Sequence, residues 1–339
     1  MIRLDNIPDK EVRNWYENKK KEESDGKFNS IVSLKNVERS RKPQIVEVDS
    51  SEKISLCVVY SLWTNRKYLR LLYTSILSQY KFTDVHYAHV KVFTDKHLFN
   101  ETKSMLSGFP IEVIQVNEKF RKYATINHSS LDEFKTIVVC DCDTFFYSQA
   151  NKPSIERQQF IDHRANVYRR LEQENRIFML EDPDQSFKVF YSRMELSPYT
   201  VASDYIRWFE VHNCPEVVEN ILERPRWFLS CFMSFPKHIF AGKEWLKYCE
   251  DALKMSYNGR DLPHGCDETI FLTYAWKKNH IIEDITALGM KMRAVYAAYV
   301  GDYLDNLEFT EKDLYILHPL HGSFCIRYEV QSIYEKILE

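Results

Sequence analysis

The strongest constraint on the fold is a repeated alternation, from Ile54 onward, between apolar strand-like runs and segments with helically spaced apolar residues. This pattern predicts strands at 54–62, 89–95, 111–116, 136–147, 227–235 and 313–318, and helices at 68–80, 120–129, 243–257 and 267–279. Repeated strand–helix alternation favours an α/β layer with a mostly parallel sheet. Ligands of such sheets bind at the carboxyl ends of the strands, so functional residues are expected there.

Two stretches differ from this pattern. Residues 1–50 are charge-dense and contain few apolar side chains, which predicts a charged N-terminal extension. Residues 151–225 are polar and rich in helical patterns, which predicts a helical insertion. We therefore expect a single domain over 51–339 that carries this insertion.

Charge and hydropathy exclude several classes of protein. The chain has 46 Lys and Arg against 49 Asp and Glu, so no general attraction to nucleic acid is expected. No run approaches the roughly 18 apolar residues of a membrane span. The N-terminus is charged from Arg3 onward, unlike a signal peptide, so we expect a cytoplasmic protein. The eight cysteines form no CxxC pair, which disfavours a zinc ribbon or a thioredoxin-type site.

The most informative motif is the DxD sequence at Asp141 and Asp143. Four apolar residues, 137–140, lead directly into it, so both carboxylates follow a predicted core strand. Carboxylates at alternate positions can converge on one hard cation such as magnesium or manganese, and such a cation can hold a diphosphate. The residues alone leave a second interpretation open, in which the two aspartates cap a turn.

Further candidates lie in the second half of the chain. His318 and His321 come at the end of the last predicted strand, and either imidazole could supply a third metal ligand. Asp267 and Glu268 begin a predicted helix, where acidic residues also serve as ordinary helix caps.

Taken in order, these motifs resemble the GT-A fold nucleotide-sugar glycosyltransferases, particularly the glycogenin-like retaining enzymes of family 8. The resemblance covers roughly residues 54–324. It implies a Rossmann-like mixed sheet flanked by helices and a manganese or magnesium ion. It also implies a nucleotide diphosphate sugar, expected to be UDP-linked, as donor, and a hydroxyl of a glycan or other molecule as acceptor. The insertion at 151–225 would then shape the acceptor side.

The resemblance also assigns roles to individual residues. The implied metal ligands are Asp141, Asp143 and His318. The implied catalytic residues are Asp267, Glu268 and Lys122. The implied nucleotide-sugar contacts are Thr64, Asn65, Tyr68, Lys122, Asp141, Ser230, His321 and Gly322.

Two other functions remain open. A sugar-nucleotide-binding protein on a degenerate transferase scaffold is one, because Leu229 and Cys231 stand where the family has a polar residue and a glycine. A haloacid-dehalogenase-type phosphatase is the other, but its DxDxT spacing would need Thr or Val at the position of Phe145. The sequence does not predict an oligomeric state.

Overall fold

The structure is a computed structural model. It describes residues 45, 48–63, 66–117, 122–147, 166–181, 228–254, 256–257, 260–261, 267–288, 290–296 and 314–320. Within these ranges no helix is both long enough and apolar enough to span a bilayer. Most of the predicted extension, residues 1–50, and most of the predicted insertion, residues 151–225, lie outside the described residues.

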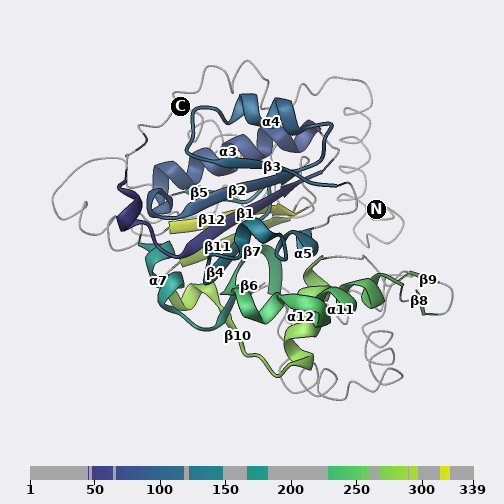
Figure 1. The fold of residues 1–339 in the computed structure, drawn as a ribbon. Helices are drawn as coiled ribbons and strands as arrows, with labels where there is room; N and C mark the ends of the chain where they lie inside the picture. Colours follow the sequence, from purple (N-terminus) through teal and green to yellow (C-terminus); the bar gives the residue numbers. More distant parts are fainter. Residues whose placement is uncertain are drawn as a thin grey trace, which may run out of the picture.

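A seven-stranded sheet forms the centre of the molecule, in the order β10-β6-β7-β4-β1-β2-β3 (Figure 1). Strands β1, β2, β3 and β4 are mutually parallel, whereas β7 runs antiparallel to both of its neighbours, β4 and β6. The strands are β1 (Leu56–Leu62), β2 (His89–Thr94), β3 (Glu112–Gln115), β4 (Thr136–Cys140), β6 (Ile177–Glu181), β7 (Phe228–Pro236) and β10 (Ile282–Asp284). The predicted fold class, a mixed α/β sheet flanked by helices, is confirmed.

Two small sheets accompany the main one. The first has the order β11-β12-β5, and the second pairs β8 with β9. Their strands are β5 (Phe145–Tyr147), β8 (Ser256–Tyr257), β9 (Arg260–Asp261), β11 (Met290–Tyr296) and β12 (Leu314–Leu320). Strand β5 follows β4 after a short turn, so the first small sheet begins at the end of the main one.

Helices cover both faces of the main sheet. The α-helices are α3 (Arg66–Phe82), α4 (Phe99–Met105), α5 (Lys122–Thr125), α7 (Val167–Gln173), α11 (Gly242–Lys254) and α12 (Asp267–Lys277). Neighbouring residues of β1 show the two faces: the Tyr60 hydroxyl bonds Ser75 of α3, whereas the Ser61 hydroxyl bonds Thr125 of α5. Since successive strand side chains point to opposite faces, α3 and α5 lie on opposite sides of the sheet.

Burial explains why the central strands form where they do. Every residue of β4 and β7 is buried, as expected of strands with helices on both faces. Strand β3 lies at the edge of the sheet and is only partly buried. The core is continued on the α11–α12 side by packed aromatic rings, in which Trp245 stacks on Phe271 with ring centroids 5.1 Å apart.

Two elements differ from the sequence-based expectation. In the described part of the helix predicted at 120–129, residues 122–129, only α5 is α-helical, and a 3₁₀ turn follows at Ser129–Leu131. The segment 151–225 was expected to be helical. Its described part, residues 166–181, contains strand β6 as well as helix α7, and β6 joins the main sheet because its apolar residues pack in the core.

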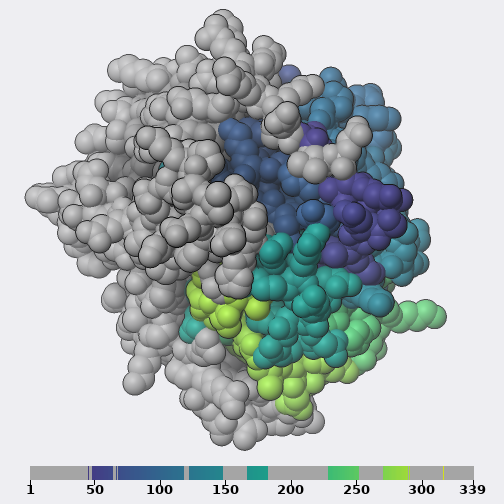
Figure 2. Space-filling model, turned by 90° about the vertical axis from the view of Figure 1, so that its left-hand side faces the viewer, coloured from purple at the N-terminus to yellow at the C-terminus, as the bar shows by residue number. Residues whose placement is uncertain are grey.

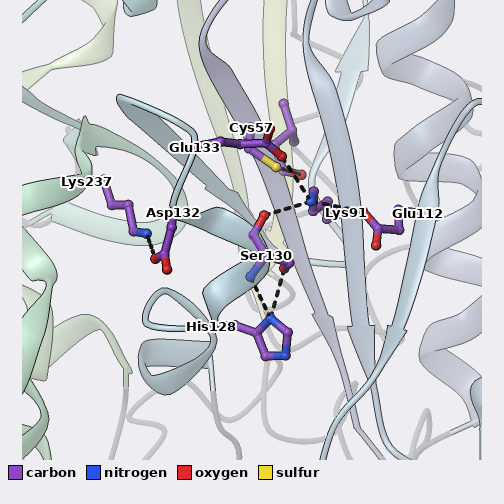
Figure 3. Close-up of polar contacts among 9 residues, drawn as sticks. Cys57, Lys91, Glu112, His128, Ser130, Asp132, Glu133 and Lys237 are labelled. Atoms are coloured by element: carbon purple, nitrogen blue, oxygen red, sulfur yellow. Dashed lines mark hydrogen bonds and ion pairs between the residues drawn. The ribbon is translucent and has the colours of Figure 1, made fainter.

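A buried lysine, Lys91 of β2, is surrounded by acceptors from β3 and from the segment that precedes β4. Its ammonium group donates to the Ser130 carbonyl at 2.7 Å and pairs with Glu112 at 2.9 Å (Figure 3). Glu133 lies 3.8 Å away. A buried ammonium group is tolerated because partners replace its lost water. This cluster ties β2 and β3 to the segment that leads into β4.

Asp84 joins the end of α3 to α7. Its carboxylate accepts hydrogen bonds from the backbone amides of Tyr168 at 3.0 Å and Arg169 at 3.2 Å. Arg170 of α7 also donates to the Leu288 carbonyl, so α7 bridges two distant parts of the chain. Figure 2 shows the teal surface that includes α7 between the purple-blue first half and the yellow-green segment near Leu288. Burial raises the pKa of Asp84 to about 6, against the opposing effect of these amides.

We predict that Asp84 makes stability depend on pH. Because the folded pKa lies above the unfolded value of 3.8, this group's contribution is fully present below pH 3.8 and is lost as pH rises through about 6. The free energy of unfolding of the wild type, relative to Asp84→Asn, should fall by about 2–3 kcal/mol between pH 3.5 and pH 7. Urea unfolding of both proteins across this range measures the difference. A difference that is constant with pH would contradict the assignment.

Candidate active site at the carboxyl edge of the sheet

The site is located by the topology of the main sheet. From β1 the chain continues to β2 and β3 on one side, and then returns to place β4 on the other side of β1. Such a reversal opens a crevice at the carboxyl ends of the two central strands, where ligands of open α/β sheets bind. Asp141 directly follows β4 at this point.

The DxD residues lie on a tight turn that is fixed to β7. The Thr144 amide donates to the Asp141 carbonyl at 3.1 Å and closes the turn. The Cys231 carbonyl of β7 accepts both the Asp141 amide at 2.8 Å and the Thr144 hydroxyl at 2.9 Å. Both ends of the turn are therefore held by one backbone oxygen.

Cys142, between the two aspartates, anchors the turn to β1. Its thiol donates to the Ser61 carbonyl at 3.4 Å and is buried. Burial raises the pKa of Cys142 well above its usual value, and the carboxylates of Asp143 and Asp141 raise it further. The thiol therefore serves as a hydrogen-bond donor that anchors the turn to β1.

Lys122 supplies a buried positive charge beside the DxD turn. Its ammonium group contacts Asp141 Oδ1 at 2.5 Å, the Ser230 carbonyl at 2.7 Å and Ser230 Oγ at 3.3 Å. The lysine side chain is 7% exposed, whereas that of Asp141 is 32% exposed. The pair thus presents a carboxylate to solvent with a desolvated cation behind it.

Tyr68 lies close to the same carboxylates. Burial raises the pKa of its phenol, and the negative charge of Asp143 raises it further. The structure therefore brings together five residues that the sequence analysis gave as candidates: Tyr68, Lys122, Asp141, Asp143 and Ser230.

The closing strand lies beside the DxD turn. In the antiparallel pairing of β12 with β5, Leu317 is opposite Phe145. His318 is the next residue of β12, and Phe145 comes two residues after Asp143, so the backbone of His318 runs next to the turn. Asp267 and Glu268 begin α12, as predicted, and α12 packs against α5 and β7. Thr64, Asn65, His321 and Gly322 lie outside the described residues.

The donor set at this edge suits a hard divalent cation. Two carboxylates on a rigid turn are oxygen ligands of the kind that magnesium and manganese prefer. The part of the chain whose side chains are described contains no group of three or more His, Cys, Asp or Glu arranged to hold a metal. A third protein ligand would therefore come from elsewhere, and β12 is the adjacent strand.

Among the residues that the structure describes, two buried polar atoms at the carboxyl ends of β1 and β2 have no hydrogen-bond partner. They are Nε1 of Trp63, which follows β1, and Oγ1 of Thr94, which ends β2. Buried polar atoms are nearly always satisfied, so unsatisfied ones at a crevice are candidates for bonding a ligand. The sequence did not single out either residue, because a Trp and a Thr at strand ends are also ordinary core residues.

A hollow of about 480 Å³ lies at the amino end of β4, the end opposite to Asp141, and is lined in part by Phe134, Thr136 and Pro236. Thr136 begins β4 and Asp141 follows its end, so the strand separates them by roughly 16 Å at about 3.3 Å per residue. We place the candidate site at the carboxyl end of β4, because the buried cation and the paired carboxylates are there.

Comparison with known proteins gives structural neighbours only. No family model and no curated protein matches the sequence. The fold is similar to mouse xyloside xylosyltransferase 1, with 11% identity, a TM-score of 0.41, and coverage of 79% of this chain and 98% of that chain. It is similar to the WbbM bifunctional glycosyltransferase, with 13% identity, a TM-score of 0.47, and coverage of 84% and 50%.

A third neighbour is core-mannan synthase A from Aspergillus fumigatus in its Mn/GDP form, with 12% identity, a TM-score of 0.35, and coverage of 62% of this chain and 67% of that chain. These neighbours are glycosyltransferases. At such low identities and TM-scores they carry no inference about the activity of this chain, which depends on its own side chains.

We predict a strong energetic coupling between Lys122 and Asp141. A double-mutant cycle with Lys122→Met and Asp141→Asn should give a coupling free energy of unfolding of about 1–3 kcal/mol, because each single change leaves a partner unpaired. Chemical denaturation of the four proteins measures it. In the control cycle, Lys91→Met with Asp141→Asn should be additive, since Lys91 is held before β4 and Asp141 follows it. Additivity in the first cycle would disprove the pairing.

Proposed function

We propose that the chain is a metal-dependent glycosyltransferase that moves a sugar from a nucleotide diphosphate sugar to a hydroxyl of a glycan or another acceptor. The observation that carries this proposal is the buried contact of Lys122 with Asp141 on the DxD turn, at the carboxyl edge of β4. The donor is UDP-linked and the enzyme is of the glycogenin-like family-8 type, as the sequence motifs suggest.

The chemistry follows from charge. When the bond between the sugar and the diphosphate breaks, negative charge grows on the leaving nucleotide diphosphate. A manganese or magnesium ion at this edge supplies electrostatic stabilisation of that charge. Asp141, Asp143 and His318 are the residues that would hold it. Lys122 adds a fixed positive charge from the side of α5, and little reorganisation is needed because the ammonium group is already desolvated.

The proposal places the nucleotide next to the carboxyl ends of the central strands. We assign base and ribose contacts to Thr64, Asn65 and Tyr68, with Ser230 near the sugar and with His321 and Gly322 near the phosphates. The unsatisfied Trp63 and Thr94 atoms support a polar ligand along this edge. Asp267 and Glu268, at the start of α12, act on the sugar: as base in an inverting reaction, or by positioning the donor in a retaining one.

The structure weighs against phosphatase chemistry. A haloacid-dehalogenase-type site needs a Thr or Val at the position of Phe145, and this Phe is 1% exposed and lies in β5. One observation favours the binding-protein alternative. Leu229 and Cys231 are both buried in β7, so neither side chain adds a polar contact to the donor sugar. Hydrolysis of the donor distinguishes a transferase from a binding protein.

We predict that a sugar nucleotide stabilises the protein only in the presence of the metal. A thermal-shift panel of nucleotide sugars with and without manganese should show a metal-dependent rise in Tm for the correct donor, because ligands that bind the native state stabilise it. That donor should then release its nucleotide diphosphate slowly. Asp143→Asn should abolish this turnover and keep the fold. Turnover at the wild-type rate in the variant would contradict the assignment, and binding without any turnover would favour the binding protein.

We also predict that Lys122→Met lowers kcat by about 10²–10³-fold, as expected when a preorganised electrostatic group is removed from a buried site. Lys91→Met is the matched control, since it also removes a buried lysine but lies away from the DxD turn. It should keep the wild-type kcat at a temperature at which both variants are folded. Equal losses in the two variants would indicate that Lys122 acts through stability alone.

A further inference from the structure

Helix α3 carries a stripe of buried polar residues that the core does not require. Ser75, Ser78 and Gln79 are at most 1% exposed, and their spacing places them on one face of the helix. Burying a hydroxyl or an amide is costly unless it forms hydrogen bonds. The partners of this stripe therefore indicate its purpose.

The two serines of the stripe bind the DxD turn and the strand that follows it. Ser75 Oγ donates to the Thr144 carbonyl at 2.5 Å. Ser78 Oγ accepts the Phe146 amide at 2.9 Å and donates to the Ser75 carbonyl at 2.6 Å. The turn is thus held by α3 through Thr144 as well as by β7 through Cys231.

A directed chain of hydrogen bonds ends at the same carbonyl. Tyr168 of α7 donates to the Gln79 side-chain oxygen, and the Gln79 amide donates to the Tyr60 hydroxyl. Since Ser75 uses its single proton on Thr144, the Tyr60 hydroxyl donates to Ser75 Oγ at 2.9 Å. Each donor in such a chain polarises the next, which strengthens the final bond to the turn.

We propose that Ser75 and Ser78 are positioning residues that set the DxD turn for binding the donor and its cation, an inference that rests on the proposed function. Neither serine touches the substrate. They act through the backbone of Thr144 and Phe146, and so fix the direction in which Asp141 and Asp143 leave the turn.

Ser75→Ala tests this role, with Thr83→Val as the matched control. Thr83, the residue directly after α3, is also buried. Its hydroxyl donates to the Gln79 carbonyl at 2.7 Å and accepts from the Val85 amide at 3.4 Å, at the end of the helix away from the DxD turn. Each variant removes one buried hydroxyl, so their losses of Tm can be compared directly. Ser78→Ala is the second test variant, should Ser75→Ala fail to fold.

The first measurement is amide hydrogen exchange, which needs no ligand. Exchange in a peptide covering 141–147 should become about tenfold faster in Ser75→Ala and stay unchanged in Thr83→Val. The second is binding of Mn²⁺ by electron paramagnetic resonance, in which the dissociation constant should rise about tenfold in Ser75→Ala and less than about twofold in the control.

The outcomes separate the two proposals. Unchanged exchange or unchanged Mn²⁺ affinity in a folded Ser75→Ala overturns the positioning role and leaves the proposed function standing. Equal changes in Thr83→Val also overturn it, because they would reflect stability alone. A wild type that binds neither Mn²⁺ nor any sugar nucleotide overturns the proposed function and, with it, the positioning role.

Discussion

The site depends on one electrostatic constraint, the enclosure of the Lys122 ammonium group. A desolvated lysine must be surrounded by acceptors, and here these are the Asp141 carboxylate and the backbone and side chain of Ser230. Lys122 lies in α5, Asp141 directly follows β4, and Ser230 lies in β7. Enclosing this one cation therefore brings three separate segments of the chain together. Under the proposed function, the positive charge of Lys122 also lies where the leaving diphosphate would develop negative charge.

The DxD turn is held by a neighbouring strand of the sheet and by a helix on one face of it. The Cys231 carbonyl holds it from β7, and Ser75 holds it from α3. Neither of these two contacts involves the side-chain carboxylates of Asp141 and Asp143. A site built on a turn between two strands gains precision when its backbone is fixed by such supporting contacts.

The sequence predicted the regular parts of this protein well, because their signals are local. Apolar runs predicted β1, β2 and β4, and the acidic pair predicted that α12 begins at Asp267. The residues of the DxD motif follow a core strand, as expected. The predictions failed where tertiary packing decides: in the described residues 122–129 of the helix predicted at 120–129, only Lys122–Thr125 is α-helical, and the strand at Ile177–Glu181 arises within a segment whose composition favoured helix.

By itself, the sequence determined the α/β class and marked Asp141 and Asp143 as candidates, since these follow from hydrophobic periodicity and motif spacing. Lys122 became a candidate only through the family resemblance. Only the tertiary structure decided that Lys122 meets Asp141, that Cys231 contributes through its carbonyl, and that serines of α3 hold the turn. The physical reason is that such contacts join residues far apart in the chain, and backbone acceptors are the same in every residue. Spacing along the sequence therefore cannot encode them, whereas the order and direction of strands in the sheet do.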